Sequence, residues 1–358
     1  MQQVIIDFGQ VHLFGHELGV RIYGYGLMLV LGFLCGITLA RWRARRFGEN
    51  PDVVTSVGLL ALLGGVIGAR LAFVIEKWDT QFAHLRDPLP EILNITSGGL
   101  IYYGGVALAS ITIIAYLLIR RLPVRRYLDI IAPSLMIGLA FGRAGCLVNG
   151  CCYGGPARPD FPLAMTFPYA AKPLVHLGAG NAYGGASVSP VFAHQVNVTP
   201  ARGGLAGEVP EWLFRGERGG LKSPSELTGQ QVAEAAHLHS RPVQPAQVYG
   251  ILNALLIAGL LLAFSRLRRA EGQVFALMLI LPAVGRFMEE IIRGDNPHDV
   301  LRLVLTHNQY SSLGLMFIGI LLWLALRLLP GSAGPFWNER LAVAEIQSAP
   351  PKQRKGRS

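Results

Sequence analysis

The chain has 358 residues, of which 51% are hydrophobic and only 15% charged, and its mean hydropathy is +0.40. About a quarter of the residues of a soluble domain are charged, so this composition indicates an integral membrane protein. The net charge of +10 does not indicate nucleic-acid binding, because the basic residues stand in short clusters beside apolar runs. No cleavable signal peptide is expected, since residues 1–20 lack a basic start and a small-residue cleavage site.

Seven apolar runs are long enough to cross a bilayer. About 20 residues of α-helix span the ~30 Å hydrocarbon core, because each residue advances a helix by about 1.5 Å. Residues 1–20 mix apolar pairs with charged and histidine side chains and are expected to lie on the membrane surface. We expect an all-α integral membrane protein with about seven transmembrane helices, at residues 22–41, 54–75, 99–119, 129–149, 246–265, 273–292 and 311–329.

Clusters of arginine and lysine mark one side of the membrane. With seven alternating spans every cluster falls on the same side, which the positive-inside rule identifies as the cytoplasm. We therefore expect a multi-pass membrane protein whose N-terminus is outside and whose C-terminus is cytoplasmic. The clusters are Arg41, Arg43, Arg45 and Arg46; Arg120, Arg121, Arg125 and Arg126; Arg266, Arg268 and Arg269; and Lys352, Arg354, Lys355 and Arg357.

This topology divides the chain into four parts. Residues 1–150 form a membrane domain of four spans, and residues 246–330 form a second one of three spans. Between them, residues 151–245 are rich in glycine, proline and polar residues, which predicts a small, loop-rich extracytoplasmic head. Residues 331–358 form a basic cytoplasmic tail rich in proline and alanine.

Three spans that run from inside to outside each carry an arginine: Arg70, Arg143 and Arg286. Measured along each helix from its cytoplasmic end, the three arginines lie at roughly 24, 21 and 20 Å, which is in the outer half of the bilayer. A charged side chain is costly there and usually functional. Glu289 and Glu290, one turn beyond Arg286, can neutralise part of the charge. A phosphate is the other suitable counter-ion, because a guanidinium group donates two parallel hydrogen bonds to it.

A structural interpretation stays open for each of these residues. The arginines can pair with carboxylates or extend to the interface, which applies most to Arg70 because it is nearest the surface. Glycines beside Arg143 and Arg286 allow close approach either of a ligand or of another helix. Three tyrosines beside glycine pairs can be interfacial anchors or can line a shared pocket; they are Tyr25, Tyr102 and Tyr103.

Three of the four cysteines, Cys146, Cys151 and Cys152, lie at the outer end of the fourth span. Thiols outside the cytoplasm tend to oxidise, so a structural disulfide is one interpretation. A redox pair or a thiol nucleophile is another. A metal site is not expected, because the spacing lacks a CxxC knuckle and no histidine is adjacent. Cys35, inside the first span, is expected to be a buried, inert thiol.

Eight segments of the chain resemble the prolipoprotein diacylglyceryl transferase family and follow the family's order. Each segment alone is a weak signal, but eight of them on a matching seven-span topology indicate kinship over most of the membrane part. The segments are Tyr25–Met28, Gly68–Arg70, Gly98–Gly105, Gly142–Gly154, Asp160–Pro168, Gln244–Tyr249, Gly285–Asp295 and Asn308–Ser311.

The resemblance implies an enzyme of the bacterial inner membrane. It moves the diacylglyceryl group of phosphatidylglycerol to the lipobox cysteine thiol in a prolipoprotein signal peptide. The product is a thioether, and glycerol-1-phosphate leaves. The resemblance also implies that Arg143 and Arg286 hold the lipid headgroup, with Tyr103 as a third catalytic residue. No cofactor is expected. The residues expected to line or orient the site are Tyr25, Arg70, Asn149, Gly154, Gln247, Glu289 and Glu290.

The chain also departs from the family pattern at polar positions. Cys146 stands where the family has asparagine, Cys151 where it has an acidic residue, and Tyr103 where it has histidine. Pro282 replaces a tyrosine four residues before Arg286. Two alternatives therefore stay open: an extracytoplasmic thiol–disulfide enzyme that uses the three clustered cysteines, and a membrane protein that binds or transports lipid without catalysis.

Overall fold

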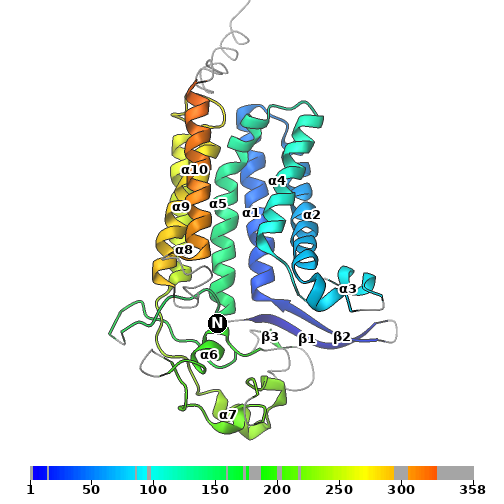
Figure 1. Ribbon diagram of the computed structural model, residues 1–358, viewed down its shortest axis with the longest axis vertical. Helices are drawn as coiled ribbons and strands as arrows, with labels where there is room; N and C mark the ends of the chain where they lie inside the picture. Colours follow the sequence, from blue (N-terminus) through cyan, green and yellow to red (C-terminus); the bar gives the residue numbers. More distant parts are fainter. Residues whose placement is uncertain are drawn as a thin grey trace, which may run out of the picture. The chain divides into compact units, whose positions relative to one another are not determined.

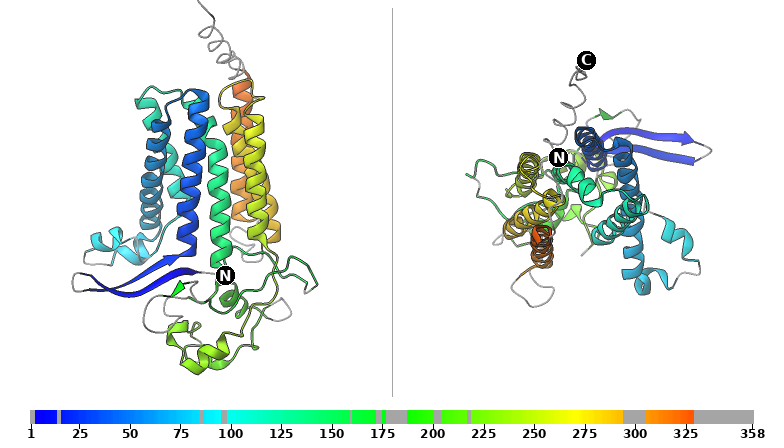
Figure 2. Two further views of the ribbon diagram at one scale, coloured as in Figure 1. Left: turned by 180° about the vertical axis from the view of Figure 1, so that it is seen from behind. Right: turned by 90° about the horizontal axis from the view of Figure 1, so that it is seen from above.

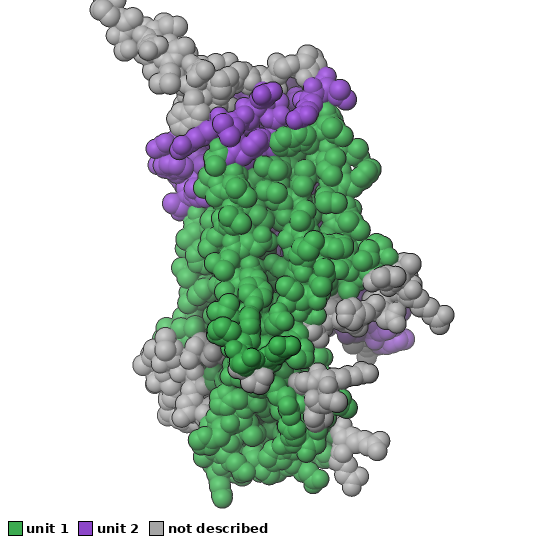
Figure 3. Space-filling model, turned by 90° about the vertical axis from the view of Figure 1, so that its left-hand side faces the viewer, with its two compact units in different colours: residues 1–36, 135–263, 276–325 green, residues 37–134, 264–275, 326–358 purple. Residues whose placement is uncertain are grey.

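The computed structural model describes residues 3–13, 16–84, 87–94, 98–158, 160–171, 175–176, 187–199, 204–216, 219–293 and 305–328 (Figure 1). The predicted basic tail, residues 331–358, lies outside the described residues. The chain divides into two compact units, coloured in Figure 3. Unit 1 comprises residues 1–36, 135–263 and 276–325, and unit 2 comprises residues 37–134, 264–275 and 326–358.

Long helices occur at each of the seven positions where the sequence predicts a span. They are α1 (Gly24–Phe47), α2 (Pro51–Glu76), α4 (Tyr102–Ile119), α5 (Val124–Asn149), α8 (Ala246–Phe264), α9 (Gln273–Ile292) and α10 (His307–Leu328). Within the described residues, six of them are long and apolar enough to cross a membrane. The seventh, α9, is as long but carries three charged residues towards its C-terminal end. The protein is thus a multi-pass, mainly helical membrane protein.

The helix boundaries follow local chemistry. Helix α2 begins after Asn50, whose side chain accepts a hydrogen bond from the backbone N–H of Asp52 at 2.8 Å, and Pro51 occupies the first helical position. Helix α1 ends before Gly48, whose φ of 71° favours glycine. Many apolar side chains on these helices are exposed, including Leu63 and Leu256 at 59% and 64%. Such exposure suits helices that face lipid.

In unit 2, α2 and α4 pack backbone against backbone. A Cβ atom added at Gly68 would lie 2.4 Å from the carbonyl oxygen of Gly104, and one added at Gly105 would lie 2.8 Å from that of Gly65. Small residues permit this approach, which is the usual way for helices to associate in lipid. A short helix, α3 (Leu89–Leu93), and a helical turn at Trp78–Phe82 lie between α2 and α4 in the sequence.

Unit 1 combines helices with a small sheet. Helices α8, α9 and α10 run side by side in the views of Figures 1 and 2. The N-terminal residues form strand β1 (Val4–Leu13), which pairs with β2 (His16–Tyr23) antiparallel and with β3 (Val175–His176) parallel. The sequence predicts only a surface segment for residues 1–20, so the hairpin is a finding of the structure.

The region between α5 and α8 has an apolar core of its own. It contains α6 (Pro190–Gln195), α7 (Gly229–Ala235) and helical turns at Glu211–Leu213 and Pro224–Glu226. The loop-rich character predicted for this head agrees with these short elements. Its buried side chains include Tyr169, Phe192, Leu213 and Leu227.

A buried ion pair ties together the segments of unit 2. Asp129 on α5 is fully buried, pairs with Arg268, and accepts hydrogen bonds from the backbone N–H groups of Gly272 and Phe275 at 2.8 and 2.9 Å. Arg43 on α1 donates to the carbonyl oxygens of this same turn of α5. Burying these charges requires that each finds a partner.

We expect Asp129→Ala to lower the free energy of unfolding by about 3–5 kcal/mol, because it leaves a buried arginine without its carboxylate. Thermal unfolding of the purified protein in detergent measures the change. Asp52→Ala is the matched control, since the ion pair of Asp52 with Arg41 is exposed and is worth below about 1 kcal/mol. Equal losses in the two variants would contradict the structural role of Asp129.

Candidate functional site

An ion pair joins α5 to α9 in unit 1. Nη2 of Arg143 donates to Oε2 of Glu289 at 2.6 Å, and the two side chains are only 14% and 12% exposed. The sequence predicts a place in the site for both residues. Because Arg143 and Glu289 come from different helices, the pair fixes the position of the guanidinium group between them. At this burial the pair is shielded from water, which strengthens its electrostatic interaction.

Arg286 belongs to the same array of charges. Its Nη2 lies 2.9 Å from Oε2 of Glu290, while its Nη1 lies 3.8 Å from the Glu289 oxygen that Arg143 also contacts. That Nη1 atom is buried and makes no hydrogen bond to any residue that the structure describes. The Glu289 carboxylate thus contacts two guanidinium groups, and Nη1 of Arg286 can still donate a hydrogen bond to an anion.

Glu290 is held from the side opposite Arg286. Its Oε1 atom accepts hydrogen bonds from Oγ1 of Thr306 at 3.1 Å and from Nδ2 of Asn308 at 3.0 Å, at the start of α10. The Glu290 side chain is fully buried. With these two hydrogen bonds and its ion pair to Arg286, the Glu290 carboxylate links α9 to the start of α10.

Glycines bring other elements close to Arg143. A Cβ atom added at Gly250 on α8 would lie 3.0 Å from Nε of Arg143, so the arginine side chain crosses the helix at that glycine. One added at Gly145 would lie 2.9 Å from the ring of Tyr25. These contacts place the side chains of Tyr25 and Arg143 against helix backbone, and the Tyr25 side chain stays 40% exposed.

The loop after α5 is held by backbone hydrogen bonds. Nε2 of Gln247, a fully buried residue, donates to the carbonyl oxygen of Cys151 at 2.9 Å. The N–H of Gly154 donates to the carbonyl oxygen of Gln244 at 2.9 Å, and a Cβ atom at Gly154 would lie 2.7 Å from that residue's side chain. The carbonyl oxygen of Asn149 accepts from Nε2 of Gln3 at 3.4 Å. These residues therefore shape the loop beside the arginines.

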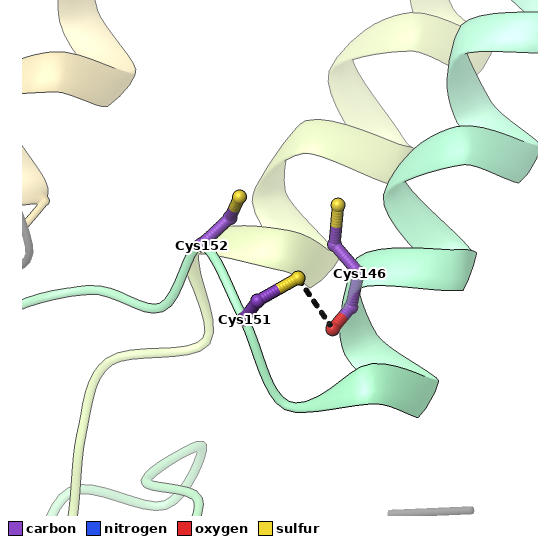
Figure 4. A group of neighbouring side chains, drawn as sticks. All are labelled: Cys146, Cys151 and Cys152. Carbon is purple, nitrogen blue, oxygen red and sulfur yellow. Dashed lines mark hydrogen bonds between the residues drawn. The ribbon is translucent and has the colours of Figure 1, made fainter. Parts of the chain in front are cut away.

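The three cysteines of this region come together. Cys146 lies on the last turns of α5, and Cys151 and Cys152 lie on the loop that follows (Figure 4). Their Sγ atoms are all within 4.8 Å of one another. Cys152 has a left-handed backbone, with φ of 56°, which is uncommon for a residue other than glycine. Hydrogen bonds from the Cys146 and Cys151 thiols lower the pKa of Cys152, and Arg293 and Arg143 act in the same direction.

Cys35 differs from these three. It lies on α1 and is exposed, so the expectation that it is buried is wrong. An apolar helix that faces lipid exposes thiols as readily as it exposes leucines, which explains the difference.

The remaining two predicted site residues belong to unit 2. Arg70 is 6% exposed and uses its guanidinium group on backbone carbonyl oxygens, those of Glu91 at 2.5 Å, Ile92 at 2.9 Å, Gly98 at 2.7 Å and Gly99 at 3.1 Å. These bonds favour a structural role, which the sequence analysis left open. Tyr103, at the start of α4, is 47% exposed and packs edge to face against Tyr102.

Comparison with known proteins assigns the family. The model of the prolipoprotein diacylglyceryl transferase family matches residues 14–325. The chain belongs to the prolipoprotein diacylglyceryl transferase family. A phosphatidylglycerol–prolipoprotein diacylglyceryl transferase of Clostridium tetani is 28% identical over 302 residues, which cover 84% of this chain and 92% of that protein. A protein of the same name from Paraburkholderia phymatum is 28% identical over 330 residues, which cover 88% and 93%.

Sequence reasoning missed two residues that pack beside the candidate site. Gly250 accommodates the Arg143 side chain, and Asn253 packs against Gly285, where an added Cβ atom would lie 2.1 Å from its Nδ2 atom. A glycine and an asparagine one turn apart on an apolar helix were the available signals. They do not by themselves distinguish helix packing from support of a ligand site.

We expect Glu290→Ala to destabilise the protein by about 3–5 kcal/mol, because it removes the buried partner of Arg286 and the acceptor of two hydrogen bonds from α10. Thermal unfolding in detergent measures the loss. Glu234→Ala is the control, since Glu234 on α7 is exposed. An unchanged unfolding temperature in Glu290→Ala would show that Arg286 is held by other contacts.

Proposed function

We propose that the array of Arg143 and Arg286 binds the phosphate of phosphatidylglycerol, and that the protein transfers the lipid's diacylglyceryl group to the lipobox cysteine of a prolipoprotein. The observation that carries this proposal is the buried Nη1 of Arg286, which makes no hydrogen bond within the described residues beside a second arginine. A phosphodiester oxygen satisfies such a donor well, because charge-assisted hydrogen bonds are short and strong. Family membership supplies the reaction class, a transferase.

The chemistry of the reaction defines what the arginines do. The acceptor sulfur attacks the glyceryl carbon that carries the phosphate, so a C–S bond forms and the C–O bond breaks. The electron pair leaves on the phosphate oxygen, and glycerol-1-phosphate is released. Arg143 and Arg286 stabilise the negative charge that develops on that oxygen, in a site from which water is largely excluded.

Glu289 keeps the two arginines apart and aligned before lipid binds. Its Oε2 atom is the only described contact common to both guanidinium groups. A phosphate that enters between the two arginines replaces part of their contact with Glu289. The negative charge of Glu289 repels further anionic groups and so limits how many the site accepts. A single phosphodiester is therefore favoured over a lipid with several phosphate charges.

The membrane setting follows from the positive-inside rule applied to the observed helices. We propose that the protein lies in the bacterial inner membrane with its N-terminus and the 151–245 head outside, so that the arginine array faces the outer leaflet. Prolipoprotein signal peptides and lipid then enter sideways between helices, and the head guides the peptide. Family membership does not favour the alternatives of a thiol–disulfide enzyme or a non-catalytic lipid-binding protein.

We expect Arg143→Ala to abolish transfer, by about a thousandfold or more, because it removes charge stabilisation at the leaving oxygen. The assay mixes purified protein, phosphatidylglycerol and a lipobox peptide, and detects the thioether-linked diacylglyceryl peptide by mass spectrometry. Arg266→Ala, at an exposed arginine after α8, is the control. Wild-type transfer by the Arg143 variant would exclude the proposed role.

A second substitution tests the position of Arg143 without removing its charge. We expect Gly250→Val to slow transfer at least tenfold, because the new side chain occupies the space where Arg143 crosses α8. Gly259→Val is the matched control on the same helix, since no atom lies within 4 Å of an added Cβ atom there. Equal rates for the two variants, in the same transfer assay, would contradict the observed path of the Arg143 side chain.

A further inference from the structure

The three clustered cysteines have the geometry of a shared ligand set. With all three Sγ atoms within 4.8 Å of one another, a point at their centre lies at most roughly 2.8 Å from each, against about 2.3 Å for a zinc–thiolate bond. Rotation about the Cα–Cβ bonds can bring the three sulfur atoms slightly closer together. They then lie at the distance of a zinc–thiolate bond from one central ion. A disulfide uses only two of the three sulfurs and leaves the third beside it.

The choice of metal follows from the donor atoms. Thiolate sulfur is a soft ligand and selects zinc or monovalent copper over magnesium or calcium. Three protein ligands with an open fourth position are the arrangement of catalytic zinc sites, whereas structural zinc sites are closed by four. The described group contains three cysteines and no fourth histidine, aspartate or glutamate. The left-handed backbone of Cys152 directs its thiol into this group (Figure 4).

The cluster lies where the acceptor thiol is needed. Cys146 follows Arg143 by three residues on α5, so the two side chains share one face of the helix about one turn apart. The ring of Tyr25 packs one residue before Cys146, at Gly145. Glu289 and Glu290 already contact arginines through their Oε2 atoms. A metal ion held by the three cysteines would supply a separate means of generating a thiolate beside the arginines.

We propose that Cys146, Cys151 and Cys152 bind one zinc ion, and that its open coordination position takes the acceptor cysteine of the prolipoprotein as a thiolate. This inference rests on the proposed transfer function and adds a metal site to it. The sequence predicts no metal site here, because the spacing lacks a CxxC knuckle and no histidine is adjacent. The structure brings the three sulfurs together through the turn that follows α5.

The acceptor cysteine enters the reaction at the open position of the zinc ion. The acceptor thiol coordinates zinc and releases its proton to water, since a coordinated thiol is deprotonated. The zinc-bound sulfur attacks the glyceryl carbon, the C–O bond breaks, and the electron pair leaves with the phosphate held by Arg143 and Arg286. The thioether formed is a weaker ligand than a thiolate and dissociates. No redox change occurs, and the zinc ion is left with its three cysteines.

Zinc binding is measured first, on the full-length protein purified in detergent. We expect about one zinc per wild-type chain by elemental mass spectrometry, and loss of most of it in Cys146→Ser, Cys151→Ser and Cys152→Ser. Cys35→Ser is the matched control, because Cys35 lies on α1 and outside the cluster. Cobalt substituted for zinc gives thiolate charge-transfer absorption in the wild type and the control only, which is a readout independent of activity.

Transfer activity then tests the role of the metal. We expect removal of zinc by a chelator to slow transfer about a hundredfold, which is the usual effect of losing a group that removes a proton. Added zinc should restore the transfer rate. Full activity of a zinc-free protein would overturn the inference and leave the proposed function intact. Zinc retained by the cysteine variants would also overturn the inference. The same holds for a protein mass lower by two hydrogens, because that loss indicates a disulfide. A wild type that binds zinc at the cluster but transfers no lipid would overturn both.

Discussion

The cost of holding charge inside a membrane protein governs the arrangement of this molecule. Arg143 and Arg286 are both largely buried, and each is kept there by a carboxylate of α9. Those carboxylates need support in turn, and Glu290 receives it from Thr306 and Asn308. A charge that loses its partner at this burial costs several kcal/mol, so the contacts that build the candidate anion site also position α5, α9 and α10.

Other buried arginines of the chain show what a purely structural arginine looks like. Arg70 directs its guanidinium group to four backbone carbonyl oxygens, and Arg43 is similarly engaged with the turn around Asp129. These side chains join segments and have little capacity for a ligand. Arg286 differs from these two because its Nη1 atom is buried and makes no hydrogen bond within the described residues, and because Arg143 contacts the same carboxylate. The two arginines around Glu289 set this candidate site apart.

The sequence predicted the helices well because their signal is local. A run of about 20 apolar residues has few ways to satisfy its backbone in lipid other than a helix, so composition alone located α1, α2, α4, α5, α8, α9 and α10. The N-terminal sheet was not foreseen. Its hairpin joins neighbouring residues, but β1 also pairs with β3 at residues 175–176, more than 150 positions away. Pairings of that kind depend on chain topology and leave little trace in a short window of sequence.

For the site, the sequence by itself determined which residue types are present: arginines in apolar helices, two carboxylates one turn from Arg286, and three cysteines beside glycines. The family motifs were also identified from the amino-acid sequence alone. Only the tertiary structure decided which charges are partners, that Arg70 binds backbone carbonyl oxygens, that Gly250 accommodates Arg143, and that three sulfurs share one volume. The physical reason is that partners of a buried charge are chosen by distance in three dimensions, and helices far apart in sequence supply them.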